Sequence, residues 1–335
     1  MVSRRVFIPV AVLAGMLFSS SPVSAQGGGL KKIYVGVPAV SMGNIVIFFA
    51  KEAKLFEKQG LDAEVVLMQG SGIASKALIA GSVQISPVAT PTVMSAVLAG
   101  SDMVILGHTM PGVMQFLMVR ADIKKTEDLK GKTIGVTRFG SLGDFLIRHL
   151  AKIKGLNPDK DFALLQTGGD VERLLALKQG RIQAANLSHP AYILAQRAGF
   201  SVLWDYFKEV VYPWSEIASR RSIIRQDRDV IMRYMKAHIE GIARFKQEPE
   251  FAKKVIKKTL RLNLDDDDLA QRSWELFAKH RLASPYPNIK GMKTSYEYVG
   301  LTRPDVHKHR PEEFIDASFV DELDKSGFIK NLYQN

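Results

Sequence analysis

The chain has 335 residues, 46% of them hydrophobic and 24% charged, which is the balance of an ordinary globular protein with a large core. It contains no cysteine, which excludes disulfides, thiolate catalysis, cysteine-based zinc sites and a lipid-modified cysteine anchor. The formal net charge of +12 is compatible with an anionic surface or an anionic solute, whereas the export signal described next argues against a nucleic-acid partner.

The first 25 residues have the pattern of a cleavable secretory signal. Arg4 and Arg5 precede an apolar run over 6–18, and small residues follow up to Ala25. The run is about a dozen residues, too short for the roughly 20 that span a bilayer. We therefore expect a mature chain that starts near Gln26, lies in the periplasm and does not insert into a membrane. The arginine pair also resembles a twin-arginine signal, so the export route stays open.

A self-similarity at a spacing of 99 residues divides the following part of the chain into two matched units. Three landmarks recur at this spacing: Gly36-Val37 as Gly135-Val136, Gly81 as Gly180, and Pro91 as Pro190. Each unit is predicted to alternate strands with helices, which indicates parallel sheets covered by helices. We therefore expect an α/β protein with two lobes, each a parallel-rich sheet flanked by helices.

The predicted elements follow this repeat and then change to helices. The first unit is predicted to have strands over 33–37, 63–68 and 83–86 and helices over 44–58 and 73–80. The second is predicted to have strands over 133–136, 162–165 and 181–186 and helices over 142–154 and 171–179. A helical C-terminal extension is predicted, with helices near 227–247, 249–260, 266–280 and 312–325. Asp265 to Asp268 lack the spacing of a calcium loop and indicate the start of the third of these helices.

The predicted binding region lies outside the carboxyl ends of the parallel strands, where open sheets of this kind bind ligands. Three loops of each unit qualify: 38–44, 69–72, 87–91, 137–143, 166–170 and 187–190. They are rich in glycine and small hydroxyl residues, which expose backbone N–H groups at helix N-termini and so attract anions. The sequence thus predicts one cleft between two lobes.

Individual side chains in these loops are candidates for ligand contact. Arg138 directly follows a strand and could clamp a carboxylate, sulfonate or phosphate, with a surface salt bridge as the alternative. Ser141, followed by an acid three residues later, resembles a helix cap with a capping-box acid, and a cap can still face a ligand. His189 lies in a strand-end loop, and Trp214 and Glu216 lie where the chain should cross back between lobes.

Several segments resemble a known family. Residues 52–62 (Glu52 to Asp62), 77–84 and 126–136 are similar to the periplasmic binding proteins of the nitrate, aliphatic sulfonate and taurine importers and of the related thiamine-precursor binders. The resemblance covers roughly residues 30–220. It implies a type II periplasmic binding fold whose lobes close on a solute by hinge motion and then dock on an ABC permease and its ATPase.

The resemblance also implies a domain division and a set of contacts. It places lobe 1 at 26–117, completed by 218–335, and lobe 2 at 118–217, with crossings near 110–120 and 214–220. Relatives contact solute from the loops that match the following residues: Ser41, Met42, Gly43, Asn44, Gly70, Ser71, Gly72, Ile73, Ala89, Thr90, Arg138, Phe139, Gly140, Ser141, Leu187 and Ser188. The solute's identity does not carry over, and we expect a small one with an anionic group.

Two other functions compete with solute capture for an importer. An enzyme is disfavoured because no nucleophile elbow, zincin motif or Walker loop occurs, and the enzymatic pyrimidine-synthesising branch of the superfamily relies on cysteine, which this chain lacks. A sensory role, in which the liganded protein docks on a membrane receptor, stays open. We expect a monomer with no catalytic residue, no cofactor and no metal site.

Overall fold

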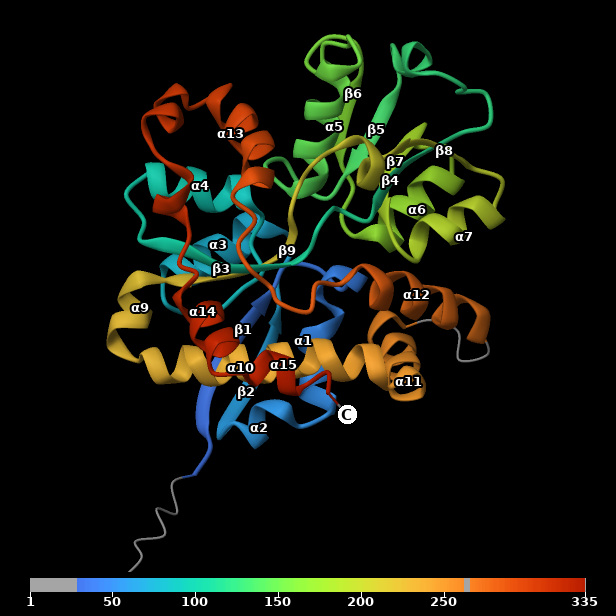
Figure 1. Cartoon of the computed structure of the whole chain (residues 1–335). Coiled ribbons are helices and arrows are strands. Elements are labelled where there is room, and N and C mark those ends of the chain that lie inside the picture. Colours follow the sequence, from blue (N-terminus) through green and yellow to red (C-terminus); the bar gives the residue numbers. More distant parts are fainter. Residues whose placement is uncertain (1–28, 262–265, 335) are drawn as a thin grey trace, which may run out of the picture.

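The computed structural model describes residues 29–261 and 266–334 (Figure 1). The expected export signal and Asp265 lie outside the described residues. The described chain forms two α/β lobes that lie one above the other in Figure 1, joined by two connections near the centre. Within the described ranges, no helix is both long and apolar enough to cross a membrane.

Lobe 1 is built on a mixed sheet. Its strands are β1 (Lys31–Val37), β2 (Leu61–Leu67), β3 (Met103–Met110) and β9 (Trp214–Arg220). Strands β1 and β2 are parallel, and β3 and β9 are antiparallel. The two pairs are joined by bridges from Ile85 to Val35 and from Ser86 to Ala218, so the strand predicted over 83–86 is reduced to two bridged residues.

The predicted helices of lobe 1 start and end close to the predicted positions, except that one is split and two further helices are present. The lobe 1 helices are η1 (Met42–Asn44), α1 (Ile45–Glu52), α2 (Leu55–Lys58), α3 (Ser71–Ile79), α4 (Thr90–Leu98), α9 (Arg221–Gln226) and α10 (Arg228–Gln247). The helix predicted over 44–58 is split because Lys54 takes a left-handed conformation with φ of 55°. Helices α4 and α9 were not predicted.

Lobe 2 repeats this architecture. Its strands are β4 (Gln115–Val119), β5 (Thr133–Val136), β6 (Ala163–Gln166), β7 (Ala184–Ser188) and β8 (Ser201–Asp205), in the order β6-β5-β7-β4-β8. Strand β4 is antiparallel to both of its neighbours, and the other pairs are parallel. Its helices are η2 (Thr126–Leu129), α5 (Leu142–Ile153), α6 (Asp170–Lys178), α7 (Ala191–Arg197) and α8 (Tyr206–Glu209).

The structure preserves the 99-residue spacing of the sequence repeat. Helix α3 spans 71–79 and α6 spans 170–178, and α4 and α7 both begin beside the repeated prolines Pro91 and Pro190. In each lobe the antiparallel strand, β9 or β4, is the first strand after the chain arrives from the other lobe. The two-lobe α/β fold predicted from the sequence is therefore confirmed.

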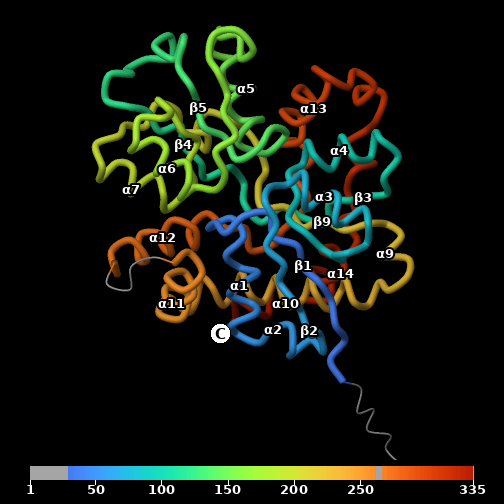
Figure 2. The backbone as a smooth tube through the Cα atoms, turned by 180° about the vertical axis from the view of Figure 1, so that it is seen from behind, coloured from blue at the N-terminus to red at the C-terminus, as the bar shows by residue number. Residues whose placement is uncertain are grey.

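The C-terminal extension is helical, as predicted, and packs around lobe 1. It consists of α11 (Pro249–Leu260), α12 (Asp267–His280), η3 (Lys290–Met292), α13 (Lys293–Gly300), η4 (Pro304–Lys308), η5 (Pro311–Phe314), α14 (Ser318–Lys325) and α15 (Phe328–Asn331). The helix predicted over 312–325 begins only at Ser318, because Pro311 starts a separate 3-10 turn. Figures 1 and 2 show α12 beneath lobe 2 and α13 beside α5.

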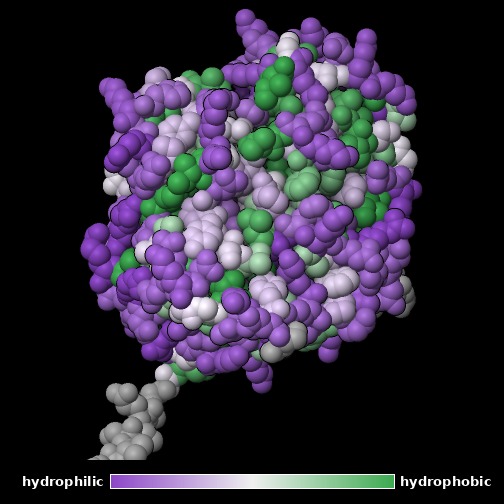
Figure 3. All heavy atoms as spheres, viewed as in Figure 1, coloured by the Kyte–Doolittle hydropathy of each residue, from purple (hydrophilic) through white to green (hydrophobic). Residues whose placement is uncertain are grey.

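The chain crosses between the lobes over residues 111–114, after β3, and 210–213, before β9. The expected boundaries at 117/118 and 217/218 fall inside β4 and β9, so we propose that lobe 2 comprises residues 115–209. The largest apolar cluster runs through these connections and contains residues of both lobes, among them Met110, Val113 and Tyr212. The outer surface is mainly hydrophilic, with a group of apolar residues near the middle of the face in Figure 3.

Candidate functional site

A pocket of about 80 Å³ lies between the lobes, at the carboxyl ends of the parallel strands. Eight of the predicted ligand-binding residues line it: Ser41, Asn44, Gly70, Ser71, Ala89, Ser141, Trp214 and Glu216. Eight further residues line it; six of them belong to the predicted loops and two, Gln115 and Ser215, do not. The six are Pro38, Ala39, Pro87, Thr137, Leu142 and Gly143. The pocket therefore draws on lobe 1, lobe 2 and the strand that follows the second crossing.

The other predicted residues lie outside the lining. Gly72, Ile73, Phe139 and Gly140 are exposed, and Arg138 is half-buried, with its Nη2 donating to Gln69 Oε1 of the other lobe at 2.5 Å. Leu187 is in the core of lobe 2, Ser188 bonds Asp170, and His189 bonds Ser273. Met42, Gly43 and Thr90 are buried just behind lining residues. No residue of the 166–170 or 187–190 loops lines the pocket.

Glu216 is the one ionisable side chain in the lining, and it is only 4% exposed. Its Oε1 accepts hydrogen bonds from Thr90 N and Thr90 Oγ1, both at 3.0 Å, and from the Tyr212 hydroxyl at 3.5 Å. Burial raises the pKa of Glu216 to about 7, although these donors favour the ionised form.

His108 fixes the direction of these hydrogen bonds. Burial lowers the pKa of His108 to about 3, so its ring is neutral at pH 7. Its Nδ1 accepts from Asn288 N at 3.0 Å, which leaves the proton on Nε2. That proton points to Thr90 Oγ1 at 3.3 Å, and the Thr90 hydroxyl proton is then free to donate to Glu216. The network thus presents only donors to Oε1 of Glu216.

Trp214 forms a wall of the pocket and depends on glycine at position 43. A Cβ atom on Gly43 would lie 2.5 Å from the Trp214 ring, so no larger residue fits without moving the indole. Ser215 has a left-handed φ of 59°, and its hydroxyl donates to Gly43 O at 2.5 Å. The wall and the loop before α1 are therefore fixed to each other.

Arg281 holds the same loop from behind. It is 2% exposed, and its guanidinium donates to Thr109 Oγ1 at 2.8 Å and to Met42 O at 3.0 Å. Among the described residues it forms no ion pair, and burial lowers its pKa to about 9. Since it does not line the pocket, Arg281 positions the loop and leaves the lining without a basic side chain.

On the lobe 2 side, the capping prediction for Ser141 was right about its position and wrong about its hydrogen bond. Ser141 occupies the N-cap position of α5 but makes no side-chain cap bond. Asp144 instead accepts from Gly140 N at 2.9 Å and from Arg148 Nε at 2.8 Å. Ser141 Oγ is buried and has no hydrogen-bond partner among the described residues. Because buried hydroxyls are rarely left unpaired, this oxygen is a candidate for a ligand contact.

Backbone N–H groups supply the remaining polarity of the pocket. Helices α3 and α5 begin in its lining, and the N–H groups of a first helical turn have no intrahelical acceptor. They can bind an anionic or carbonyl oxygen. The N-terminus of α4 differs, because Thr90 N is already bonded to Glu216.

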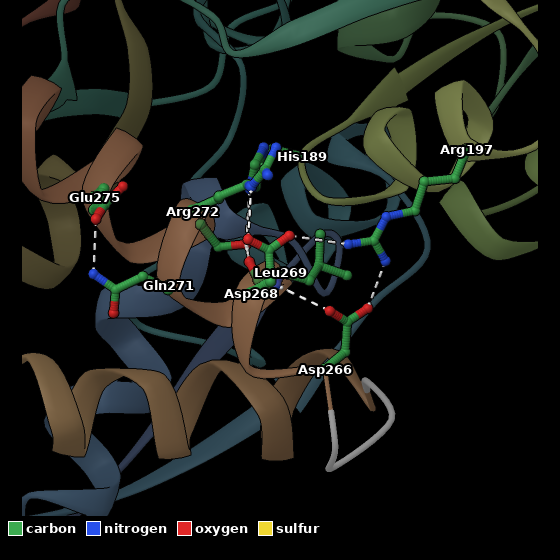
Figure 4. Close-up of polar contacts among 9 residues, drawn as sticks. His189, Arg197, Asp266, Asp268, Leu269, Gln271, Arg272 and Glu275 are labelled. Atoms are coloured by element: carbon green, nitrogen blue, oxygen red, sulfur yellow. Dashed lines mark hydrogen bonds and ion pairs between the residues drawn. The ribbon is translucent and has the colours of Figure 1, made fainter.

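Polar contacts also join the lobes between α7 and α12 (Figure 4). Arg197 of α7 reaches from lobe 2 to α12, where its guanidinium meets Asp266 at 2.7 Å and Asp268 at 3.2 Å. His189 Nε2 and Ser273 Oγ lie 2.7 Å apart in the same interface. We call these five residues the α7–α12 latch. Asp266 also caps α12 through Leu269 N, which confirms that the acidic run marks a helix start.

A family model described as NMT1/THI5 like matches residues 42–252, more than half of the chain. The chain belongs to this family. A protein of Brucella abortus named as a binding protein is 28% identical over 277 residues, which cover 81% of this chain and 80% of that one. A protein of Brachyspira hyodysenteriae named as an ABC transporter periplasmic binding protein is 23% identical, over 63% of this chain and 64% of that one.

Solved structures agree on the fold. The periplasmic aliphatic sulphonate binding protein SsuA from Escherichia coli superposes with a TM-score of 0.66 at 20% identity, covering 86% of this chain and 91% of that one. The periplasmic nitrate-binding protein NrtA from Synechocystis PCC 6803 gives 0.67 at 14% identity, covering 89% of each chain. These two proteins bind different solutes, so the likeness identifies a periplasmic binding protein fold and not a solute.

Proposed function

We propose that this chain is a non-enzymatic, extracytoplasmic solute-binding protein that captures a small solute between its lobes and delivers it to an ABC permease and its ATPase. The observation that carries the proposal is the pocket itself, which both lobes build together, including the strand that follows the second crossing. A site divided in this way couples solute binding to lobe closure, because the solute bonds both lobes only when they are closed.

The family and the names of relatives support the importer role. The lining supports binding without catalysis, since Glu216 is its single ionisable side chain and has no acid–base partner there. The described residues also contain no cluster of three or more acidic or histidine side chains that could hold a metal ion. An anionic or carbonyl oxygen of the solute would bond the first-turn amides of α3 and α5.

Solute binding is tested first by thermal shift of the chain from Gln26 onward, against sulfonates, carboxylates, nitrate, pyrimidines and their amino derivatives. A ligand at 100 times its Kd should add about 2.7 kcal/mol of stability. Small-angle X-ray scattering with and without the hit should then show compaction. No stabilisation by any compound would count against the proposal.

Transport is tested with a candidate ABC permease and its ATPase from the same organism, reconstituted in liposomes. We expect ATP hydrolysis to rise when the liganded protein is added and to stay lower with the free protein. A protein that binds solute tightly but leaves the ATPase unchanged would instead favour the sensory role, in which a membrane receptor is the partner.

A further inference from the structure

The ionisable side chain in the pocket lining is acidic, although the net charge of the whole chain is positive. This difference bears on the charge of the solute. Glu216 is the one ionisable residue in the lining, and no lysine, arginine or histidine forms an ion pair with it among the described residues. Arg138 bonds Gln69 instead, and Arg281 bonds the loop before α1. A buried carboxylate without a cationic partner is costly to maintain.

The two oxygens of Glu216 differ. Oε1 receives the three donors from Thr90 and Tyr212, which anchor it on the lobe 1 side. In the part of the chain that the structure describes, no other residue donates a hydrogen bond to Oε2, although the side chain lines the pocket. Oε2 is thus the acceptor that a bound molecule would meet.

An anionic group is a poor match for this wall. At the low effective dielectric of a closed cleft, an anionic group would be repelled strongly by the Glu216 carboxylate. The backbone N–H of Thr90, at the start of α4, could have bonded an anion but is already bonded to Glu216. A protonated amine would instead form a charge-assisted hydrogen bond with Oε2. The indole of Trp214 lies in the same wall and also favours a cation, because the face of an aromatic ring carries partial negative charge.

We propose that the solute carries a protonated amine that binds Oε2 of Glu216, while its opposite, hydrogen-bond-accepting end bonds Ser141 Oγ and the first-turn amides of α3 and α5. This assignment rests on the proposed solute-binding function and specifies its substrate class. Ser141 Oγ, buried and unpartnered, supplies the second polar contact, from the other lobe. A compound with both ends would bridge the lobes.

The test uses matched pairs that differ only in the amino group: propane-1-sulfonate with 3-aminopropane-1-sulfonate, and butanoate with 4-aminobutanoate. Isothermal titration calorimetry should show that at least one aminated compound binds about 30-fold or more tightly than its partner, the ratio expected for pairing a buried charge. Glu216→Gln should remove most of that preference. The control is Glu64→Gln, an exposed acid of β2 paired with Lys32, which should retain it.

Proton linkage in the unmodified protein provides a second measurement that does not depend on how the variant folds. Near pH 7, an amine that requires ionised Glu216 should release protons on binding, whereas an anion that requires the protonated carboxyl should take them up. Titration in two buffers of different ionisation enthalpy gives the sign. The other titratable groups that face Glu216, His108 and Tyr212, have pKa values of about 3 and well above 10, so neither contributes at this pH.

The outcomes separate this inference from the proposed function. Equal or tighter binding of the unaminated compounds, or proton uptake on binding, would overturn the amine assignment and leave solute binding intact. A failure of all compounds in both this set and the wider screen would count against both.

Discussion

The α7–α12 latch makes a quantitative prediction about lobe closure. Arg197 contributes the only ion pairs between the two lobes among the described residues, with Asp266 and Asp268. Its side chain is 45% exposed, so each pair is worth about 0.2–1 kcal/mol rather than the value of a buried pair. Arg197→Ala should therefore cost the closed form about 1 kcal/mol, which lowers the ratio of closed to open molecules about fivefold.

The buried contact of the latch should have a larger effect. Ser273→Ala removes the partner of His189 Nε2, and His189 Nδ1 has none among the described residues, so the ring would be left buried and unpaired. Such a loss costs about 1–3 kcal/mol. The solute is retained by the closed form, so its apparent Kd should rise by the same factor as closure weakens.

The assay is single-molecule energy transfer between dyes on the two lobes, at a fixed solute concentration near Kd. At roughly 1 M salt the Debye length falls to about 3 Å, so the effect of Arg197→Ala should vanish while that of Ser273→Ala persists. Arg181→Ala, an exposed arginine of the same lobe, is the matched control. If Arg197→Ala and Arg181→Ala give the same closed fraction at low salt, the latch does not stabilise closure.

Three further predictions concern the pocket. Gly43→Ala should destabilise the fold by about 1–3 kcal/mol, because its Cβ would overlap Trp214, and calorimetry of the purified variant should also show weaker solute binding. Arg138→Ala should weaken solute binding by less than about 1 kcal/mol in titration calorimetry, because the Arg138 side chain bonds Gln69 and does not line the pocket. A loss of about 2–5 kcal/mol of binding free energy would instead show that Arg138 holds a buried charge of the solute. The pKa of Glu216 is raised from 4.5 to about 7, so between these pH values the folded state binds more protons than the unfolded state. The free energy of unfolding should therefore fall as pH rises through this window. Glu216→Gln should remove this pH dependence in urea titrations, and an unchanged pH slope in the variant would contradict the assignment.

Local patterns were sufficient to predict much of the fold. The predicted bounds of α6 and α11 agree with the structure to within one residue, and Gly180 marks the end of α6 as expected of a glycine stop. The prediction missed α4 and α7, because Pro91 and Pro190 were interpreted as loop residues. Proline is also favoured at the first turn of a helix, where its missing N–H costs nothing, so a proline alone cannot distinguish the two cases.

The site was predicted in part for the same reason. Loops at the carboxyl ends of strands are exposed to the cleft by topology alone, which explains why Ser71 and Ser141 line it. The 187–190 loop follows the same rule but is covered, because α12 contributes Ser273 as a partner for His189, a residue 84 positions away. Gln115 was missed because its position depends on where the chain crosses between lobes, which no local pattern marks.

The charge of the site was the hardest feature to predict, and the reason is physical. A net charge of +12 describes the whole surface, and Arg138 follows a strand directly, so both favour an anion from sequence alone. The field inside a closed pocket depends instead on the few charges that lose contact with water. Glu216 lies in β9, where every residue from Trp214 to Ser219 is buried. Because a glutamate is rarely buried without a partner, one acid inside a buried strand is stronger evidence about the ligand than many basic residues outside it.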